Sequence, residues 1–285
     1  MTFTLEPDHS AEPELHELVM SLRAYLVEEL IPYEQRLGLS PETKLSRADL
    51  EPIWQRSREL GFYGIALPPN LGGQGLSTRE LCALKEELMS HGSVLAHSVL
   101  GDMGGPLRAG SIMQYASTYQ LEKYLMPVIR GERACCFSIT EPDAGSDVRR
   151  MRTTARLEGD EYILEGGKVF SSAAPFADFA IVVARMDGEA EAYSAFLVDL
   201  DAPGVTVRDG EVPMSGQQIE GDIDFDECRI PVANLLGDVG QGLRIGIGRI
   251  NLNRLLHSPS IIGAARRAWT LSVEYATSRV VNGRP

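Results

Sequence analysis

The chain of 285 residues carries 27 lysines and arginines against 40 aspartates and glutamates, a formal net charge of −13. This excess of negative charge argues against a nucleic-acid partner and against an anionic membrane surface, because both are bound through basic patches. With 44% hydrophobic and 24% charged residues, the composition is that of a globular chain long enough for more than one domain. The longest apolar runs are too short to cross a bilayer, so no membrane insertion is expected.

Neither the cysteines nor the histidines show the spacing of a metal site. No Cys-x-x-Cys pair occurs, and the adjacent Cys135 and Cys136 have poor geometry for a disulfide, which favours reduced thiols. The N-terminal segment is acidic and lacks the basic-then-apolar pattern of a signal peptide. We therefore expect a cytoplasmic protein without a bound metal.

The first half of the chain has the pattern of helices. Apolar residues recur at three- and four-residue spacing from Leu15 to Leu30, and Pro32 is expected to end this first helix. Ser77 and Glu80 have the spacing of a capping box. Further helices are expected over residues 46–60, 77–90, 107–115 and 118–129.

After Gly131 the pattern changes to short alternating or β-branched segments separated by glycine, aspartate and proline. Glu158-Gly-Asp160 is a hairpin turn signal between two of these segments. Such regularly spaced strands predict a small antiparallel barrel or sandwich rather than a parallel sheet. The expected strands cover residues 153–157, 162–166, 180–185, 193–198, 205–208 and 223–225.

The helical pattern returns at Gly240 and predicts one long helix from Leu243 to about Val281, bent at Pro259. The expected organisation is therefore an N-terminal helical domain over residues 1–133 and a middle β domain over 134–236. Residues 237–285 are expected to form the first helix of an incomplete C-terminal helical domain.

The most informative motif is Phe137-Ser-Ile-Thr-Glu-Pro-Asp-Ala-Gly-Ser-Asp147. Its serine and threonine hydroxyls stand in an irregular loop set by Pro142 and Gly145. Such a loop can present backbone N–H groups and hydroxyls to a polar heterocycle or to phosphates. A capped turn without a ligand is the alternative interpretation of the same residues.

This motif closely resembles the signature of the acyl-CoA dehydrogenase family at the junction of its helical and β domains. The resemblance implies a helical N-terminal domain, a central β-barrel or sandwich and a C-terminal helical bundle, most of which this chain is expected to lack. Further segments that resemble the family follow in the same order, at residues 61–75, 166–172, 223–231, 234–237, 240–242 and 275–279.

The resemblance implies FAD as the cofactor. Phe170 replaces the usual tryptophan that packs on the flavin, Ser172 matches the hydroxyl residue near flavin N5, and Arg279 would reach a FAD phosphate across a dimer interface. For Phe170 and Ile139, ordinary core packing is the alternative, and for Arg279 a solvated helix face. The residues that the resemblance assigns to FAD are Phe137, Ile139, Thr140, Phe170, Ser172 and Arg279.

The resemblance also assigns residues to the acyl-CoA substrate. Ser146 would lie along the path of CoA, and Arg254 on the acyl-CoA face of the long helix, where a solvated position is the alternative. The reaction needs a carboxylate that removes the α-proton while a hydride leaves for flavin N5. Some members carry that glutamate just before the arginine that Arg254 matches, but this chain has Asn253, whose amide is no general base. The other family position lies in the C-terminal domain, so no catalytic base is assigned.

The implied function is FAD-dependent oxidation of an acyl-CoA thioester to the 2,3-enoyl-CoA, impaired in this chain alone. An electron-transfer flavoprotein is the implied electron acceptor, and the family is usually oligomeric. Two alternatives remain. One is an oxidase or hydroxylase of the same fold, and the other is a non-catalytic subunit that pairs with a full-length homologue.

Overall fold

The computed structural model describes residues 6–188, 192–214, 216–280 and 282. Its α-helices are α1 (Pro13–Tyr25), α2 (Ile31–Leu37), α3 (Arg47–Glu59), α4 (Thr78–Ser90), α5 (Ala96–Val99), α6 (Pro106–Ala109), α7 (Thr118–Gln120), α8 (Met126–Ile129) and α9 (Gly242–Ser278). Its strands are β1 (Cys135–Ser138), β2 (Thr154–Glu158), β3 (Glu161–Ser172), β4 (Phe179–Met186), β5 (Tyr193–Asp199), β6 (Val205–Asp209), β7 (Glu220–Pro231) and β8 (Leu235–Leu236).

The chain folds into two compact units. Unit 1 comprises Met1–Leu39, Leu76–Ala96 and Leu252–Pro285, and unit 2 comprises Ser40–Gly75 and His97–Asn251. The helix α9 therefore begins in unit 2 and continues in unit 1.

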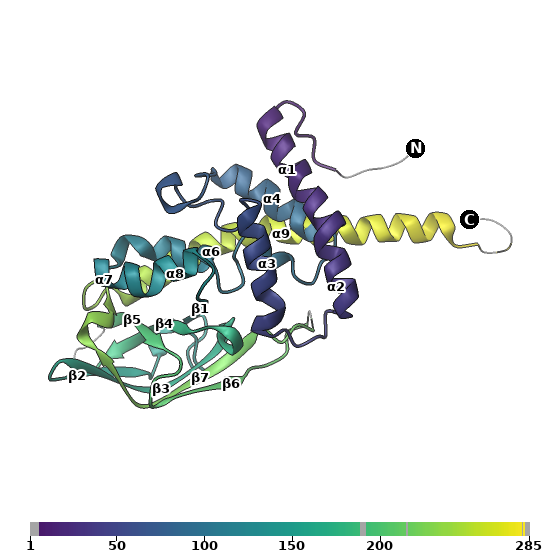
Figure 1. Cartoon of the computed structure of the whole chain (residues 1–285). Helices are drawn as coiled ribbons and strands as arrows, with labels where there is room; N and C mark the ends of the chain where they lie inside the picture. The colour runs from purple at the N-terminus through teal and green to yellow at the C-terminus, as the bar shows by residue number, and fades with distance from the viewer. Residues whose placement is uncertain (1–5, 189–191, 215, 281, 283–285) are drawn as a thin grey trace. The chain divides into compact units, whose positions relative to one another are not determined.

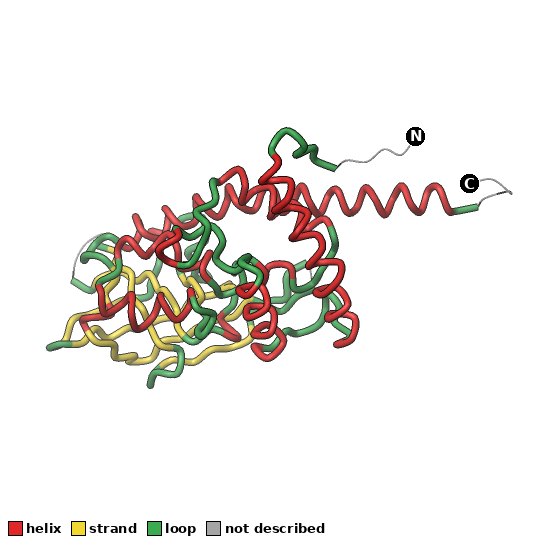
Figure 2. Tube along the Cα trace, turned by 45° about the horizontal axis from the view of Figure 1, so that its top comes forward, coloured by secondary structure: helices red, strands yellow, loops and turns green. Residues whose placement is uncertain are grey.

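Unit 2 is built on one sheet with the strand order β6-β7-β3-β2-β4-β5-β8, and with β1 beside β4. Figure 2 shows these strands, in yellow, gathered together. The short helices α6, α7 and α8 lie along one side of the sheet (Figure 1). There Ile112 and Tyr124 belong to the same apolar core as Phe179 and Leu197. Burial of this apolar surface is the main force that holds the unit together.

The hairpin predicted at Glu158-Gly-Asp160 is confirmed. Glu158 pairs with Glu161 in the antiparallel register of β2 and β3. Gly159 has φ +66°, a left-handed conformation that glycine adopts without steric cost.

The sheet of the predicted antiparallel domain also contains parallel pairings, which the sequence did not predict. The strand β4 pairs in parallel with β1 and with β2, whereas the other pairings in the described part of the sheet are antiparallel. The strand β1 overlaps the start of the signature motif at Phe137 and Ser138, where a loop was expected. Its four residues are all buried, so it lacks the polar–apolar alternation that marks a half-exposed strand.

The expectation that Pro32 ends the first helix was wrong. The chain makes a π-helical turn over Leu26–Leu30 and continues as α2, with Pro32 in its first turn. Pro127 stands in the same way in α8, directly after the π-helical turn Leu121–Leu125. A proline is tolerated in a first turn because it has no N–H to donate.

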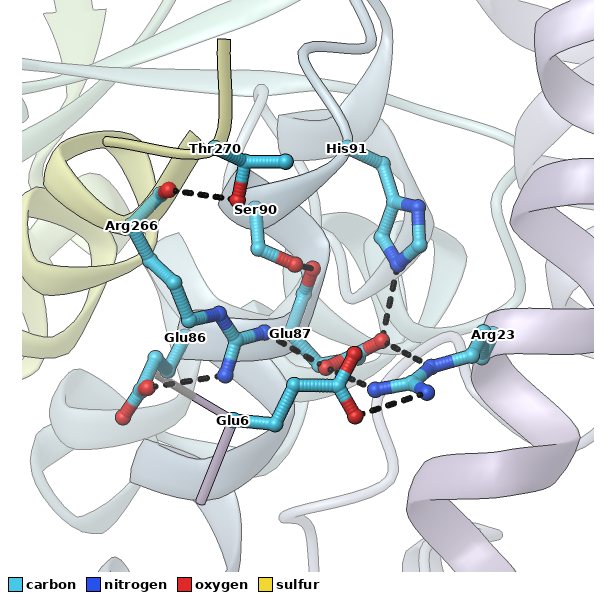
Figure 3. Close-up of polar contacts among 8 residues, drawn as sticks. All are labelled: Glu6, Arg23, Glu86, Glu87, Ser90, His91, Arg266 and Thr270. Carbon is cyan, nitrogen blue, oxygen red and sulfur yellow. Dashed lines mark hydrogen bonds and ion pairs between the residues drawn. The ribbon is translucent and has the colours of Figure 1, made fainter. Parts of the chain in front are cut away.

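Unit 1 contains a cluster of ion pairs centred on Glu87 of α4 (Figure 3). Arg23 of α1 donates through Nε to Glu87 at 2.7 Å, and Arg266 of α9 donates through Nη2 at 2.8 Å. His91 Nε2 lies 2.7 Å from the same carboxylate. The Glu87 side chain thus links α1, α4 and α9, which are far apart in the sequence.

The predicted fold class is confirmed: a helical N-terminal region, a central β domain and a long helix after it. In the part of the chain that the structure describes, no helix combines the length and the apolar character needed to cross a membrane.

Candidate functional site

The segment that follows β1 is tied to the end of β3 by two polar contacts. The Ser138 and Ser171 hydroxyls are 2.8 Å apart. The Val169 N–H donates to the Thr140 carbonyl at 2.9 Å. These contacts bring Thr140, whose side chain is half-buried, beside the end of β3.

Under this segment lies a buried ion pair. Lys168 Nζ is 2.6 Å from Glu141 Oε1, and both side chains are almost completely buried. Lys168 also donates to the Ile139 carbonyl at 3.3 Å, while Glu141 accepts hydrogen bonds from the backbone N–H groups of Arg152 and Thr153. One carboxylate and one ammonium therefore hold both ends of the connection between β1 and β2, from Ile139 to Thr153.

Phe170 presents an aromatic ring to the outside of unit 2. Its side chain is 54% exposed, and its φ of +55° is unusual for any residue except glycine. The register of β3 against β7 shifts between Lys168 and Ser171, so Phe170 stands at a bulge. Residues held in such sparsely populated backbone conformations concentrate at functional sites.

Ser172 lies directly opposite Glu220 in the pairing of β3 and β7. The Ser172 hydroxyl donates to Glu220 Oε1 at 2.9 Å. The other oxygen, Oε2, is buried and has no hydrogen-bond partner within the described part of the chain. Burial raises the pKa of Glu220 above its ordinary value, against the opposing effects of the Ser172 hydrogen bond and the Arg108 charge.

The side chains of Phe137 and Ile139 are buried in the core of unit 2 and reach Gly246 of α9. The Arg249 guanidinium stacks over the Phe137 ring, 4.6 Å from its centroid, and its Nε donates to the Arg108 carbonyl at 3.2 Å. Burial and the neighbouring Arg108 charge lower the pKa of Arg249 to about 9. In this structure, core packing accounts for both predicted side chains, and their contact with a flavin stays a prediction.

A polar cleft of about 260 Å³ lies beside the signature loop. Two arginines line it, and each is paired with an aspartate: Arg152 with Asp143 at 3.1 Å, and Arg208 with Asp224 at 2.7 Å. Because these charges are already neutralised, the cleft offers little net positive charge to a phosphate group.

The remaining predicted site residues lie on the signature loop and on or next to the C-terminal part of α9. Ser146 is exposed on the signature loop. On the part of α9 that belongs to unit 1, Arg254 is exposed and Asn253 is half-buried, and Arg279, exposed as well, follows directly after the end of α9. The structure thus brings together Thr140, Phe170 and Ser172.

Comparison with known proteins shows to which family the chain belongs. The family model of the acyl-CoA dehydrogenase N-terminal domain matches residues 12–132, and that of the middle domain matches residues 136–228. The chain belongs to the acyl-CoA dehydrogenase family.

Two relatives show the range of this family. The caffeyl-CoA reductase–Etf complex subunit CarC of Acetobacterium woodii is 33% identical over 82% of this chain and 62% of its own length. The human mitochondrial short-chain specific acyl-CoA dehydrogenase is 29% identical over 96% of this chain and 65% of its own length. The chain therefore spans less than two thirds of either relative.

A solved structure extends the comparison to the fold. A glutaryl-CoA dehydrogenase from Mycobacterium smegmatis, described in complex with FADH2, superimposes with a TM-score of 0.80 at 25% identity. The alignment covers 98% of this chain and 69% of that one.

The acyl-CoA dehydrogenase family is FAD-dependent, and the site fits an isoalloxazine ring in two respects. The exposed, conformationally strained Phe170 offers an aromatic face for stacking. The unpartnered oxygen of Glu220, next to the Ser172 hydroxyl, marks a polar position suited to a ring edge that donates and accepts hydrogen bonds.

Sequence reasoning missed Glu220, Arg249 and the partnership of Lys168 with Glu141. Lys168 and Glu141 both lie in segments that resemble the family, but their contact crosses 27 positions of the chain. Glu220 is 48 positions from Ser172, and only the pairing of β3 with β7 brings them together. No local pattern in the sequence reports such contacts.

Proposed function

We propose that unit 2 binds FAD with the isoalloxazine against Thr140, Phe170 and Ser172. In this proposal Phe170 stacks on the ring, Thr140 adds a hydroxyl at the pyrimidine end, and Ser172 stands beside N5. The exposed aromatic ring at a strained backbone position is the observation that carries the proposal. When bound, the flavin supplies hydride chemistry, and the protein supplies binding and orientation.

We further propose that the substrate is an acyl-CoA thioester, which is oxidised to the 2,3-enoyl-CoA. Ser146 and Arg254 are the proposed contacts to CoA and to the acyl-CoA thioester, and Arg279 the proposed contact to a FAD phosphate of another subunit. All three side chains are exposed and so accessible to a ligand. An electron-transfer flavoprotein is the proposed partner, supported by the relative that is named as a subunit of an Etf complex. A location in the cytoplasm remains a prediction.

The α-proton requires a base that reaches the substrate from the side opposite the flavin. Asn253 occupies the position on α9 where some family members carry a glutamate, and an amide does not accept a proton near neutral pH. We therefore expect this chain to bind FAD and acyl-CoA but to turn over slowly by itself.

The test is the visible absorbance spectrum of the purified chain, before and after anaerobic addition of a panel of acyl-CoAs. The expected result is a flavin spectrum that shifts on ligand binding and bleaches slowly. A colourless chain that takes up no added FAD would refute the cofactor proposal. A flavin spectrum that responds to no acyl-CoA would refute the substrate class.

The variant Asn253→Glu tests the missing base. A carboxylate at this position should increase the bleaching rate by at least tenfold, since general-base catalysis typically contributes about 10²–10⁴-fold. Asn251→Glu is the matched control, because it adds the same charge two residues away on α9. Equal rates in the two variants would contradict the proposed position of the substrate.

Reduction of an enoyl-CoA is a second candidate function. The relative named as a caffeyl-CoA reductase subunit, at 33% identity, favours it. In that direction a bound flavin would supply the hydride that Cβ receives. Reoxidation of a chemically reduced flavin by an enoyl-CoA, with no bleaching by any acyl-CoA, would select reduction over oxidation.

A further inference from the structure

Ser172 and Glu220 form a hydroxyl–carboxyl pair on adjacent antiparallel strands. The Ser172 O–H donates to Glu220 Oε1 at 2.9 Å, and the two residues are direct partners in the register of β3 and β7. Facing side chains in antiparallel strands are held at a fixed short distance by the backbone hydrogen bonds. The pair is therefore a built feature of the sheet.

The carboxyl group is not neutralised by an ion pair. Within the described residues, no lysine or arginine lies within ion-pair distance of Glu220, and its buried Oε2 has no hydrogen-bond partner. Burial raises its pKa, and the Ser172 hydrogen bond and the Arg108 charge oppose this shift only in part. A buried acceptor without a partner costs free energy unless it takes up a proton or meets a donor.

The charged groups on the elements around Glu220 are few. Arg108 of α6 acts on it through its charge. On the neighbouring β6, Arg208 pairs with Asp224, and Asp209 pairs with Lys44. The charged groups on β6 are thus paired with one another and not with Glu220. The protonation of Glu220 can therefore change with the hydrogen bonds that Ser172 makes.

The proton on Glu220 determines which way the hydrogen bond of Ser172 runs. With Glu220 ionised, the Ser172 O–H donates to the carboxylate, and the free lone pairs of Oγ accept from another donor. With Glu220 protonated, the carboxyl O–H donates to Ser172 Oγ, and the serine hydrogen is released to donate elsewhere.

We propose that Glu220 is a positioning residue for Ser172, and that its proton sets whether the Ser172 hydroxyl donates a hydrogen bond to the flavin N5 or accepts one from it. This inference rests on the proposed function, which places Ser172 beside N5. Oxidised flavin has an acceptor at N5 and favours protonated Glu220, whereas reduced flavin has an N5–H donor and favours ionised Glu220.

The proposal has a defined proton balance. Two-electron reduction takes up one proton at N5, and Glu220 releases its proton to solvent as the hydrogen bond reverses. Between the two pKa values of Glu220, for the oxidised and the reduced state, net proton uptake is zero. The reduction potential should therefore become independent of pH in that window and fall with pH on both sides of it.

The first test uses the full chain without cofactor and reads the titration of Glu220 by carbon-13 NMR of labelled glutamate. Glu220→Gln identifies the signal. Ser172→Ala should raise the pKa of Glu220 further, because it removes a hydrogen bond that favours the ionised form. An unchanged titration in Ser172→Ala would overturn the pair.

The second test measures the reduction potential of the bound flavin against pH. The wild type should show the pH-independent window, and Glu220→Gln, measured with its FAD site saturated, should lack it. Asp222→Asn, which removes a carboxylate two residues along β7, should behave as the wild type. An identical pH dependence in the wild type and in Glu220→Gln would overturn the proposal.

The two tests separate this inference from the proposed function. A wild-type chain that binds no FAD refutes the cofactor proposal, whereas the NMR titration still decides whether Ser172 and Glu220 are coupled. Glu220→Asp replaces Glu220→Gln in the second test where the amide prevents folding, as judged by circular dichroism. Its carboxylate is one methylene shorter, which lengthens the contact with Ser172, so the window should be lost, and its persistence at full width would overturn the proposal.

Discussion

Lys168 and Glu141 form the most deeply buried ion pair of unit 2, with the two charged atoms 2.6 Å apart. The pKa values of both groups are lowered, which favours the charged form of Glu141 and disfavours the charged form of Lys168. Burial raises the pKa of Glu141, but the Lys168 charge and the backbone hydrogen bonds bring it below its ordinary value. Burial lowers the pKa of Lys168 to about 8, despite the Glu141 charge. Both groups are therefore ionised at pH 7.

Removing one partner of this pair should be strongly destabilising. Glu141→Gln leaves the Lys168 ammonium buried without a counter-charge, and we expect a loss of about 3–5 kcal/mol in the free energy of unfolding. Urea denaturation measures it. Asp143→Asn is the control, since Asp143 is exposed, pairs only with an exposed arginine, and should cost less than about 1 kcal/mol. Equal losses in the two variants would contradict the role of burial.

The same pair predicts a dependence of stability on pH. The folded-state pKa of Glu141 is depressed, so its contribution is present above the unfolded pKa and is lost as pH falls through the folded value, below 4.5. Lys168 holds its proton less tightly in the folded chain. The contribution of Lys168 to the free energy of unfolding should therefore rise with pH between about pH 8, its pKa in the folded chain, and 10.5, its ordinary pKa.

Helix boundaries show where local sequence is sufficient and where it is not. The capping box predicted at Ser77 and Glu80 is present at the start of α4. The end of the first helix was placed wrongly, because a π-helical turn before Pro32 lets the chain continue as α2. Caps depend on neighbours three residues apart, whereas this turn depends on how the helix packs.

The cluster around Glu87 joins α1, α4 and α9 in unit 1 (Figure 3). Burial would raise the pKa of Glu87, but hydrogen bonds from His91 and Arg23 hold it far below its ordinary value. Arg266 is itself buried, with 8% of its side chain exposed. The carboxylate is therefore the shared counter-charge of two arginines.

Glu87→Gln should destabilise unit 1 by about 3 kcal/mol or more, because it leaves the buried Arg266 with only Glu86 as a counter-charge. Hydrogen exchange of α1, α4 and the C-terminal part of α9 measures the effect. The control is the adjacent Glu86→Gln, which removes the less deeply buried of the two carboxylates that pair with Arg266, at 3.1 Å. Equal hydrogen-exchange protection of these helices in Glu87→Gln and Glu86→Gln would show that apolar packing, and not the Glu87 cluster, holds the three helices together.

At the scale of the whole molecule, each compact unit is assembled from stretches of chain that are not consecutive in the sequence. Unit 1 gathers three separate stretches of chain, and unit 2 gathers two. The domains expected over residues 1–133, 134–236 and 237–285 are consecutive stretches, and their boundaries remain a prediction. The order of helices along the sequence does not show which helices pack together, because a helix can bury its apolar face against a segment far away in the chain.

The part of α9 in unit 1 exposes several large apolar side chains. Ile261 is 68% exposed, Trp269 45% and Tyr275 64%. Exposed apolar surface of this kind is typical of association sites. We expect the chain to associate in a concentration-dependent way, in keeping with the predicted oligomer.

Ile261→Glu should lower the weight-average mass in sedimentation velocity at a fixed concentration, because a charge opposes burial of this face. Ser272→Glu is the matched control on the same helix, since Ser272 is exposed and bonds only to the carbonyl of Ala268. A monomeric wild type at all concentrations would contradict this prediction.

The sequence alone determined the family, the order of helical and strand segments, the hairpin turn at Gly159 and the capped start of α4. These features depend on local periodicity, on turn chemistry and on a motif of consecutive residues. Only the tertiary structure decided the parallel pairing of β1 with β4 and the partnerships of Lys168 with Glu141 and of Ser172 with Glu220. Those contacts depend on strand register between segments far apart in the chain, where a shift of one residue would turn every side chain to the opposite face.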